Sequence, residues 1–497
     1  MVSTISLITK MNKKLVVVLA ILNLLIVGCL VWSGFFRSIL PWNWSKKNKC
    51  SIEAGTSGTG CNPVVLFWSH KAMTNRSAGL KEDMKNCSLT VGMTVQELSE
   101  LQPVVMKTRA FLDALEMIFP INYSNRLKNP CWYSNLKLEK TVEGTLSFNL
   151  RKYRNTLRKV EVTDISAGLK KDPSGKTRLL CLPYFFLAGF PKSGTTSLHS
   201  TLQQHPQIIP PTEKEPHWWT RIPLEDMSKD YLKLVAIRYP LYFTSIAEEL
   251  ATHQSNREIA YDATQSTLWD SNFLSESGRV EYCATPAVVS RTLPDAKFIV
   301  IMRNPVERAY SHYYDMCNGA LHNDVGEMPT AMQEDPSRHF HVTVQKVIDI
   351  INDCMKSDNH SLLWCLGKLW SLPKGCGYIS EHFAAGFYYI HLQKWMQFYP
   401  RENFLFLRTE DIYQESHRMM TQITEFLGVD PVSEDQAKDW LSQVQNVRPQ
   451  FQTLSDSAKL DMRPETKELL EDFFEPHNIM LAELTGDKRF LWKDSMT

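Results

Sequence analysis

Three short and almost uninterrupted apolar runs divide the C-terminal part of the chain, and a segment of helical patterning follows each of them. The runs are residues 184–190 (YFFLAGF), 297–302 (KFIVIM) and 403–407 (NFLFL). The segments that follow are residues 197–205, 304–316 and 411–427. Continuous apolar strands that alternate with helices are typical of a parallel sheet covered on both faces. The pattern therefore predicts an α/β domain over residues 181–492.

A longer apolar run lies near the N-terminus, where residues 15–36 carry no charged side chain. A helix of that length would measure about 33 Å, enough to cross a hydrocarbon core of roughly 30 Å. A cleaved signal peptide has an apolar stretch of only about 7–15 residues. The run also continues past Cys29, where a lipoprotein would turn polar. We therefore expect an uncleaved transmembrane signal anchor behind a cytosolic tail of residues 1–14.

Three observations bear on which side of the membrane the body lies. Basic residues flank the run on both sides, so charge does not orient it. Ten cysteines follow the run, an even number that fits disulfide bonds in an oxidising lumen, although their pairing cannot be deduced from spacing. Five glycosylation sequons also follow it, at Asn43, Asn75, Asn86, Asn122 and Asn359. Together the cysteines and sequons favour a lumenal body.

The segment between the anchor and the α/β domain has two parts. Residues 37–62 hold a basic cluster and then EAGTSGTG, a composition that predicts a flexible stem. In residues 63–180, Val105, Leu112, Leu115 and Phe119 recur at near-helical spacing. We therefore expect residues 63–180 to form a membrane-proximal lumenal extension that packs on the main domain.

Composition and charge narrow the class of partner. The chain is 43% hydrophobic and 22% charged, values that are typical of a globular protein. Its 55 Lys and Arg residues against 54 Asp and Glu leave a net charge of +1. That balance argues against binding by bulk attraction to nucleic acid, so we expect no nucleic-acid partner.

The turn that leaves the first apolar run has the chemistry of an anion site. It reads GFPKSGTTS over residues 189–197 and leads from a strand into a helix, where backbone N–H groups and the helix dipole attract anions. A nucleotide-triphosphate loop has a lysine where this chain has Thr195, and Lys192 lies inside the loop instead. The alternative is an ordinary strand–helix turn, but PKSGTT in this context favours an anion site in a P-loop-like sheet.

Three segments together resemble the sulfotransferases that use 3′-phosphoadenylyl sulfate as donor. PKSGTT (191–196) resembles their 5′-phosphosulfate loop, and RNPVERAYS (303–311) resembles their 3′-phosphate motif. An arginine at a strand end and a serine two turns along the next helix can both approach one phosphate. KEPHWWTR (214–221) resembles the Glu-x-His-aromatic segment of the Golgi glycosaminoglycan branch, and residues 386–395 and 475–484 also look like segments of this group. The resemblance implies the sulfotransferase fold over about residues 180–492.

The resemblance also implies a role for each matching residue. Glu215 would be the general base, although Glu213-Lys214-Glu215 by itself could be a solvated charge run. Lys192 would stabilise the leaving phosphate oxygen, and no metal is required. The 5′-phosphate would be held by Lys192, Ser193, Gly194, Thr195, Thr196 and Ser197, and the 3′-phosphate by Arg303 and Ser311.

The residues around these motifs have competing interpretations. His217 is favoured as a structural histidine, although a second acid/base role is open. One of Trp218 and Trp219 is expected in the core, whereas the other could stack on adenine or a sugar ring. Candidates for gripping an acidic glycan are Lys214, Arg221 and Lys374. A disulfide is favoured over zinc for a cluster without zinc-ligand spacing, Cys354, Cys365 and Cys376.

The function that the resemblance implies is sulfuryl transfer to a glycosaminoglycan by a single-pass type II protein of the Golgi membrane. The favoured acceptor is the 6-hydroxyl of 4-sulfated N-acetylgalactosamine in chondroitin or dermatan sulfate. The alternatives are a heparan-type or other glycan acceptor, a P-loop NTPase or kinase, and an inactive membrane-tethered glycan-binding module. The oligomeric state and the exact acceptor stay open.

Overall fold

A computed structural model describes most of the C-terminal part of the chain. The described residues are 127–134, 178–221, 238–253, 257–269, 284–322, 334–357, 383–442 and 462–493, with single positions at 113, 115, 116, 119, 123, 236, 362, 365, 366 and 369. The predicted tail, anchor and stem, much of the extension and all five sequons lie outside them. Within the described ranges no helix is both long and apolar enough to cross a bilayer.

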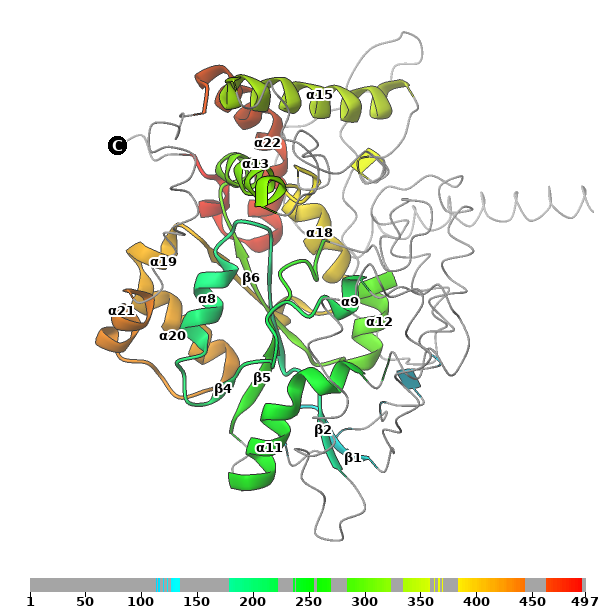
Figure 1. The fold of residues 1–497 in the computed structure, drawn as a ribbon, viewed down its shortest axis with the longest axis vertical. Helices are drawn as coiled ribbons and strands as arrows, with labels where there is room; N and C mark the ends of the chain where they lie inside the picture. Colours follow the sequence, from blue (N-terminus) through cyan, green and yellow to red (C-terminus); the bar gives the residue numbers. More distant parts are fainter. Residues whose placement is uncertain are drawn as a thin grey trace, which may run out of the picture. The chain divides into compact units, whose positions relative to one another are not determined.

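Five parallel strands form the central sheet, in the order β4-β5-β3-β6-β7 (Figure 1). Their bounds are β3 Phe185–Gly189, β4 Ile208–Ile209, β5 Ile259–Asp262, β6 Lys297–Met302 and β7 Phe404–Arg408. The three predicted apolar runs are β3, β6 and β7, which are neighbours in the sheet. The predicted α/β class with a helix-flanked parallel sheet is therefore confirmed.

Alternate residues of the inner strands enter two different cores, because successive side chains of a strand point to opposite faces. Phe185 and Leu187 pack in one core, and Phe186 and Ala188 pack in the other. The first core is covered by α8 (Thr195–Leu202), α19 (Asp411–Gln414), α20 (Ser416–Leu427) and α21 (Glu434–Ser442). The second is covered by α9 (Trp218–Arg221), η5 (Tyr239–Phe243), α11 (Thr244–His253), α12 (Ala284–Thr292) and α18 (Tyr388–Trp395).

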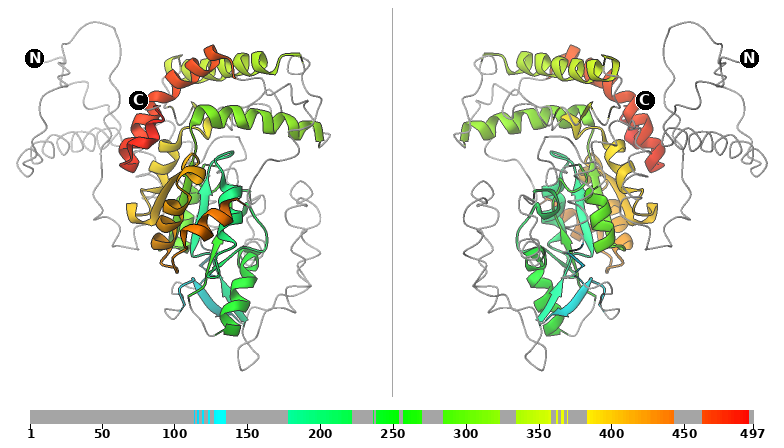
Figure 2. Two further views of the ribbon diagram at one scale, coloured as in Figure 1. Left: turned by 90° about the vertical axis from the view of Figure 1, so that its left-hand side faces the viewer. Right: turned by 90° about the vertical axis from the view of Figure 1, so that its right-hand side faces the viewer.

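A third core joins helices beyond the sheet. It lies among α13 (Pro305–His322), α15 (Pro336–Ser357) and α22 (Pro464–Thr485), and Figure 2 shows α13 and α15 as two long helices beyond one end of the sheet. Two further turns are η7 (Arg401–Asn403) and η10 (Lys488–Leu491). One prediction is wrong in detail: the helix expected over residues 411–427 is broken at Glu415, whose backbone leaves the helical region at φ −130° and ψ 40°.

A small hairpin-like pair joins residues before the main domain to it. Strand β1 (Cys131–Ser134) pairs antiparallel with β2 (Arg178–Cys181), and a disulfide bond joins Cys131 to the directly opposite Cys181. Leu115 and Phe119 are buried in the same core as the helices that cover one sheet face. A second disulfide joins Cys354 to Cys365, so these two cysteines form a disulfide as predicted. Cys376 lies outside the described residues.

Candidate active site

The PKSGTT loop (residues 191–196) has the backbone geometry of a tight strand-to-helix turn. A Cβ atom on Gly189, at the end of β3, would lie 2.8 Å from the carbonyl oxygen of Ile301, so the close approach of β6 requires glycine there. Gly194, which caps α8, has φ +86°, a left-handed conformation that glycine adopts without strain. Lys192 has φ 65°, a left-handed conformation that strains a residue with a side chain. Such strain in a loop is a frequent mark of a functional site.

The polar side chains of this loop are largely buried from solvent. Ser193 is fully buried, and its hydroxyl lies near the hydroxyl of Tyr388. Thr195 and Ser197 are each 6% exposed. The half-buried Thr196 hydroxyl accepts a hydrogen bond from Lys214 Nζ at 3.3 Å. A buried hydroxyl at a helix N-terminus, beside backbone N–H groups, fits an anionic oxygen.

The ammonium group of Lys192 points to the helix of the second motif. Its Nζ lies 3.0 Å from Oδ1 of Asp315 in α13, one turn after Ser311. The two side chains are 20% and 35% exposed. Nothing in the local sequence marks Asp315, an aspartate on a helix 123 positions further along, as the partner of this lysine.

The Arg303 motif (residues 303–311) begins where β6 ends. Arg303 directly follows the strand; its side chain is 31% exposed, and its guanidinium lies 3.9 Å from the Glu307 carboxylate. The Asn304 side chain accepts from the N–H of Val306 at 2.9 Å and so caps the start of α13. Ser311 is half-buried two turns along that helix. Since β3 and β6 are adjacent and parallel, with Gly189 opposite Ile301, both motifs leave the sheet at the same edge.

Glu215 lies in a strained segment and is held by two neighbours. Glu215 and His217 have φ values of 58° and 52° on either side of Pro216. The carboxylate forms an ion pair with Lys214, and its Oε2 lies 3.6 Å from His217 Nε2. The other imidazole nitrogen lies 3.0 Å from the hydroxyl of Ser266, which therefore orients the ring. Glu215 is not part of a freely solvated charge run, because its side chain is only 27% exposed.

The charges around Glu215 lower its pKa. Burial by itself would raise the pKa, but the His217 imidazole and the Lys214 ammonium outweigh burial and hold the pKa at about 2, against its usual 4.5. The group is therefore a carboxylate at neutral pH. Because Lys214 also reaches Thr196, one ammonium links this carboxylate to the PKSGTT loop.

The two tryptophans of the same segment both belong to the core. Trp218 and Trp219 are 3% and 1% exposed, and both rings pack against Tyr239. The expectation that one of them is buried is met, and burial leaves neither ring a face open to solvent. Of the basic residues proposed to grip a glycan, Lys214 contacts Glu215, whereas the Arg221 side chain and all of Lys374 lie outside what the structure describes.

Two residues that the sequence analysis did not single out connect the motifs. Thr409 lies just after β7. Its hydroxyl donates a hydrogen bond to the carbonyl oxygen of Ser193 at 2.6 Å and lies 3.1 Å from the carbonyl oxygen of Met302. Tyr388, at the start of α18, donates to the Arg303 carbonyl at 2.8 Å and packs on Phe190 with ring centroids 4.4 Å apart. A polar residue directly after a buried parallel strand is a signal that would have found Thr409.

The arrangement suits a ligand that carries two separate anionic groups. It offers one cradle after β3 and a second after β6, with a lysine ammonium between the two motifs and a carboxylate beside the first. Among the described side chains, no cluster of three or more His, Cys, Asp or Glu residues could hold a metal ion. The fold and these loops define an α/β domain whose loop after β3 departs from the nucleotide-triphosphate pattern.

Comparison with known proteins identifies the class more closely. The model of the sulfotransferase domain family matches residues 182–468, more than half of the chain, and the chain belongs to that family. It is similar to carbohydrate sulfotransferase 15 of Rattus norvegicus, with 30% identity over 80% of this chain and 70% of that one. The Homo sapiens protein of the same name is 29% identical over 76% of this chain and 67% of its own length.

A more distant relative is named for sulfation of a different glycosaminoglycan, heparan sulfate. The bifunctional heparan sulfate N-deacetylase/N-sulfotransferase 2 of Homo sapiens is 24% identical over 61% of this chain and 29% of that protein. The chain is therefore a sulfotransferase related to carbohydrate sulfotransferases, as predicted. Membership of this family argues against the NTPase and kinase alternatives.

Proposed function

We propose that this enzyme transfers a sulfuryl group from 3′-phosphoadenylyl sulfate to a glycosaminoglycan, at the 6-hydroxyl of 4-sulfated N-acetylgalactosamine in chondroitin or dermatan sulfate. One observation supports the identity of the donor: the PKSGTT loop and the Arg303 motif follow adjacent strands and leave the sheet at the same edge. Such a pair of cradles matches the 5′ and 3′ phosphates of one nucleotide. The acceptor rests on the KEPHWWTR segment and on the similarity to carbohydrate sulfotransferase 15.

The residues divide the chemistry among them. The acceptor hydroxyl oxygen forms a bond to sulfur while the bond from sulfur to the bridging phosphate oxygen breaks. The hydroxyl proton passes to Glu215, and adenosine 3′,5′-bisphosphate leaves. Lys192 stabilises the charge that develops on the bridging oxygen. Ser193 to Ser197 hold the 5′-phosphate, and Arg303 and Ser311 hold the 3′-phosphate.

Two ion pairs must rearrange in this mechanism. Lys192 has to exchange Asp315 for the donor oxygen. A carboxylate with a pKa of about 2 is a weak base, so Glu215 gains basicity when its contacts with the His217 imidazole and with the Lys214 ammonium are weakened. An acidic glycan is a suitable partner for that ammonium. Acceptor binding would then activate the base.

The proposed setting is the Golgi membrane, with residues 15–36 as a type II anchor and a lumenal catalytic domain. The support is the uncharged apolar run, which lies outside the described residues. The disulfides Cys131–Cys181 and Cys354–Cys365 fit an oxidising lumen. A relative from Dictyostelium discoideum, 23% identical, is named a membrane-associated sulfotransferase.

The acceptor is tested by transfer of radiolabelled sulfate from 3′-phosphoadenylyl sulfate by the full chain in detergent. Chondroitin sulfate A, unsulfated chondroitin, dermatan sulfate and heparan sulfate are offered side by side, and the label is mapped by disaccharide analysis. We expect label at position 6 of 4-sulfated N-acetylgalactosamine. Label on heparan sulfate alone would keep the chemistry and replace the acceptor, and absence of transfer to all four would contradict the proposed acceptor class.

Replacing Arg303 by alanine is expected to weaken binding of adenosine 3′,5′-bisphosphate about 10- to 100-fold, because a charge-assisted hydrogen bond to phosphate is lost. Titration calorimetry measures the dissociation constant. Adenosine 5′-monophosphate, which lacks the 3′-phosphate, should bind the variant and the wild type alike. Arg418→Ala is the matched control, because Arg418 is exposed and pairs with Glu415, three residues before it on the surface. An unchanged constant for the bisphosphate would refute the assignment of Arg303.

A further inference from the structure

The peptide unit between Arg303 and Asn304 is held from both sides. Its carbonyl oxygen, on Arg303, accepts a hydrogen bond from the Tyr388 hydroxyl at 2.8 Å. Its N–H, on Asn304, donates to Oε1 of Glu410 at 2.8 Å. These are the only two polar groups of a peptide unit, so its plane is defined by two side chains from distant parts of the chain. The plane sets the direction in which the Arg303 side chain leaves the sheet.

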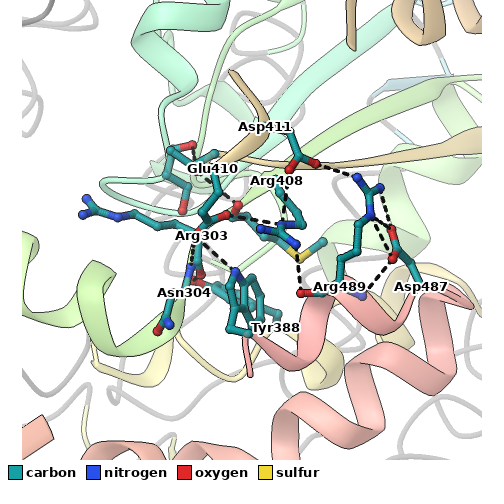
Figure 3. Close-up of polar contacts among 12 residues, drawn as sticks. Arg303, Asn304, Tyr388, Arg408, Glu410, Asp411, Asp487 and Arg489 are labelled. Atoms are coloured by element: carbon teal, nitrogen blue, oxygen red, sulfur yellow. Dashed lines mark hydrogen bonds and ion pairs between the residues drawn. The ribbon is translucent and has the colours of Figure 1, made fainter. Parts of the chain in front are cut away.

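Glu410 lies between this peptide unit and the C-terminal turn, which comprises residues 487–492. Figure 3 shows the Glu410 carboxylate beside Asn304 and Arg408. The same Oε1 atom accepts a hydrogen bond from Nε1 of Trp492 at 3.1 Å. The second oxygen, Oε2, lies 3.6 Å from Nε of Arg408. The Glu410 and Arg408 side chains are 27% and 18% exposed, so the carboxylate is partly shielded from water. Shielding strengthens its hydrogen bonds.

The C-terminal turn is itself anchored, so that Trp492 has a defined position. Arg489 pairs with Asp411 at 2.8 Å and with Asp487 at 2.7 Å, and its carbonyl oxygen accepts from Arg408 at 3.2 Å (Figure 3). Phe490 is fully buried in the core that contains Tyr388. Trp492 adopts a left-handed φ of 45°.

The ring of Trp492 also contacts the second support of the peptide unit. The centroids of Trp492 and Tyr388 are 6.0 Å apart, with an interplanar angle of 55°. Trp492 thus touches Tyr388 with its ring and Glu410 with its N–H group. One residue of the C-terminal turn therefore links the two side chains that hold the Arg303–Asn304 peptide unit.

We propose that Tyr388, Glu410 and Trp492 are positioning residues for recognition of the 3′-phosphate, and that the C-terminal turn is a structural part of the donor site. None of the three is assigned contact with the donor. They orient the Arg303–Asn304 peptide unit and, through it, the guanidinium that binds the phosphate. The inference rests on the proposed function, because it takes the ligand to be a 3′-phosphorylated adenine nucleotide.

The test compares two nucleotides that differ only in the 3′-phosphate. Tyr388→Phe removes one hydroxyl, and Trp492→Phe removes the indole N–H while keeping an aromatic ring. For each variant of the full chain, calorimetry gives the dissociation constants of adenosine 3′,5′-bisphosphate and adenosine 5′-monophosphate. We expect the bisphosphate constant to rise about 5- to 30-fold in each variant, as for a lost hydrogen bond in a shielded site. The monophosphate constant should stay within about twofold.

Two further variants separate positioning from general stability. Glu410→Gln keeps an oxygen that can accept from Asn304 and Trp492, and we expect it to retain most of the bisphosphate affinity, whereas Glu410→Ala should lose it. Lys493→Ala is the matched control, because Lys493 follows Trp492 but pairs with Glu475 on α22 at 2.6 Å. It should leave both constants unchanged.

The outcomes distinguish this inference from the proposed function. Equal losses for both nucleotides would show a general structural role and overturn the inference, as would unchanged bisphosphate affinity in Tyr388→Phe and Trp492→Phe. If the wild-type protein itself does not prefer the bisphosphate, the proposed donor fails first and the inference fails with it. A wild-type preference that the variants lose selectively supports both.

Discussion

Replacing Lys192 by alanine is expected to lower turnover by about 10²–10⁴-fold, because it removes the positive charge that stabilises the leaving phosphate oxygen. The loss should appear mainly in kcat, since charge develops on that oxygen only as the bond to sulfur breaks. Initial rates of sulfate transfer at saturating acceptor give kcat and the donor KM. A loss confined to KM would mean that Lys192 binds the donor without assisting bond cleavage.

Two control variants make the Lys192 result specific. Lys438→Ala removes an exposed lysine that pairs with Glu434, and we expect wild-type turnover. Asp315→Asn breaks the ion pair with Lys192 but leaves the ammonium in place. If the two variants Lys192→Ala and Asp315→Asn lost turnover equally, the defect would come from the broken ion pair, and the proposed role of the lysine would be wrong.

Replacing Glu215 by glutamine is expected to lower turnover by about 10²–10⁴-fold while the bisphosphate product still binds, because glutamine cannot accept the hydroxyl proton. The same assay measures the rate, and calorimetry measures product binding. Glu213→Gln is the matched control, because it makes the same change two residues away. The Glu213 carboxylate lies near Tyr242, where its charge helps to raise the pKa of the phenol. Near-wild-type turnover of Glu215→Gln would remove this residue as the base.

The lowered pKa of Glu215 gives the same variant a second, independent signature. A carboxyl whose pKa falls from 4.5 to about 2 on folding stabilises the folded state above pH 4.5, and this stabilisation is lost as the pH falls through that interval. Glu215→Gln should therefore unfold with a shallower dependence on pH between 4.5 and 2, as measured by circular dichroism. An unchanged dependence would mean that Lys214 and His217 do not stabilise the carboxylate.

Much of the fold could be predicted because its signals are local. The strands β3 and β6 are continuous apolar runs, and the predicted boundaries agree with the structure to within about one residue. The strands β4 and β5 were missed, because Ile208–Ile209 has two residues and Ile259–Asp262 ends in an aspartate. The break between α19 and α20 at Glu415 was also missed, since neither glycine nor proline marks it.

The candidate site shows the same division between local and distant information. Its proposed residues Lys192, Glu215 and Arg303 were found because each stands in a short motif beside a strand or turn. The residues that hold those motifs were not found. Asp315 is 123 positions from Lys192, Glu410 is 106 from Asn304, and Trp492 is 82 from Glu410.

The local pattern of the chain predicts the class of domain, the glycine-containing turn after β3 and the motif after β6, because side-chain periodicity and the conformational freedom of glycine act over a few residues. The position of β6 between β3 and β7 is visible only in the folded chain. That order brings Ser193, Met302 and Thr409 into hydrogen-bonding distance. The order of strands depends on burying two apolar faces at once, so no single segment carries the information that assembles the site.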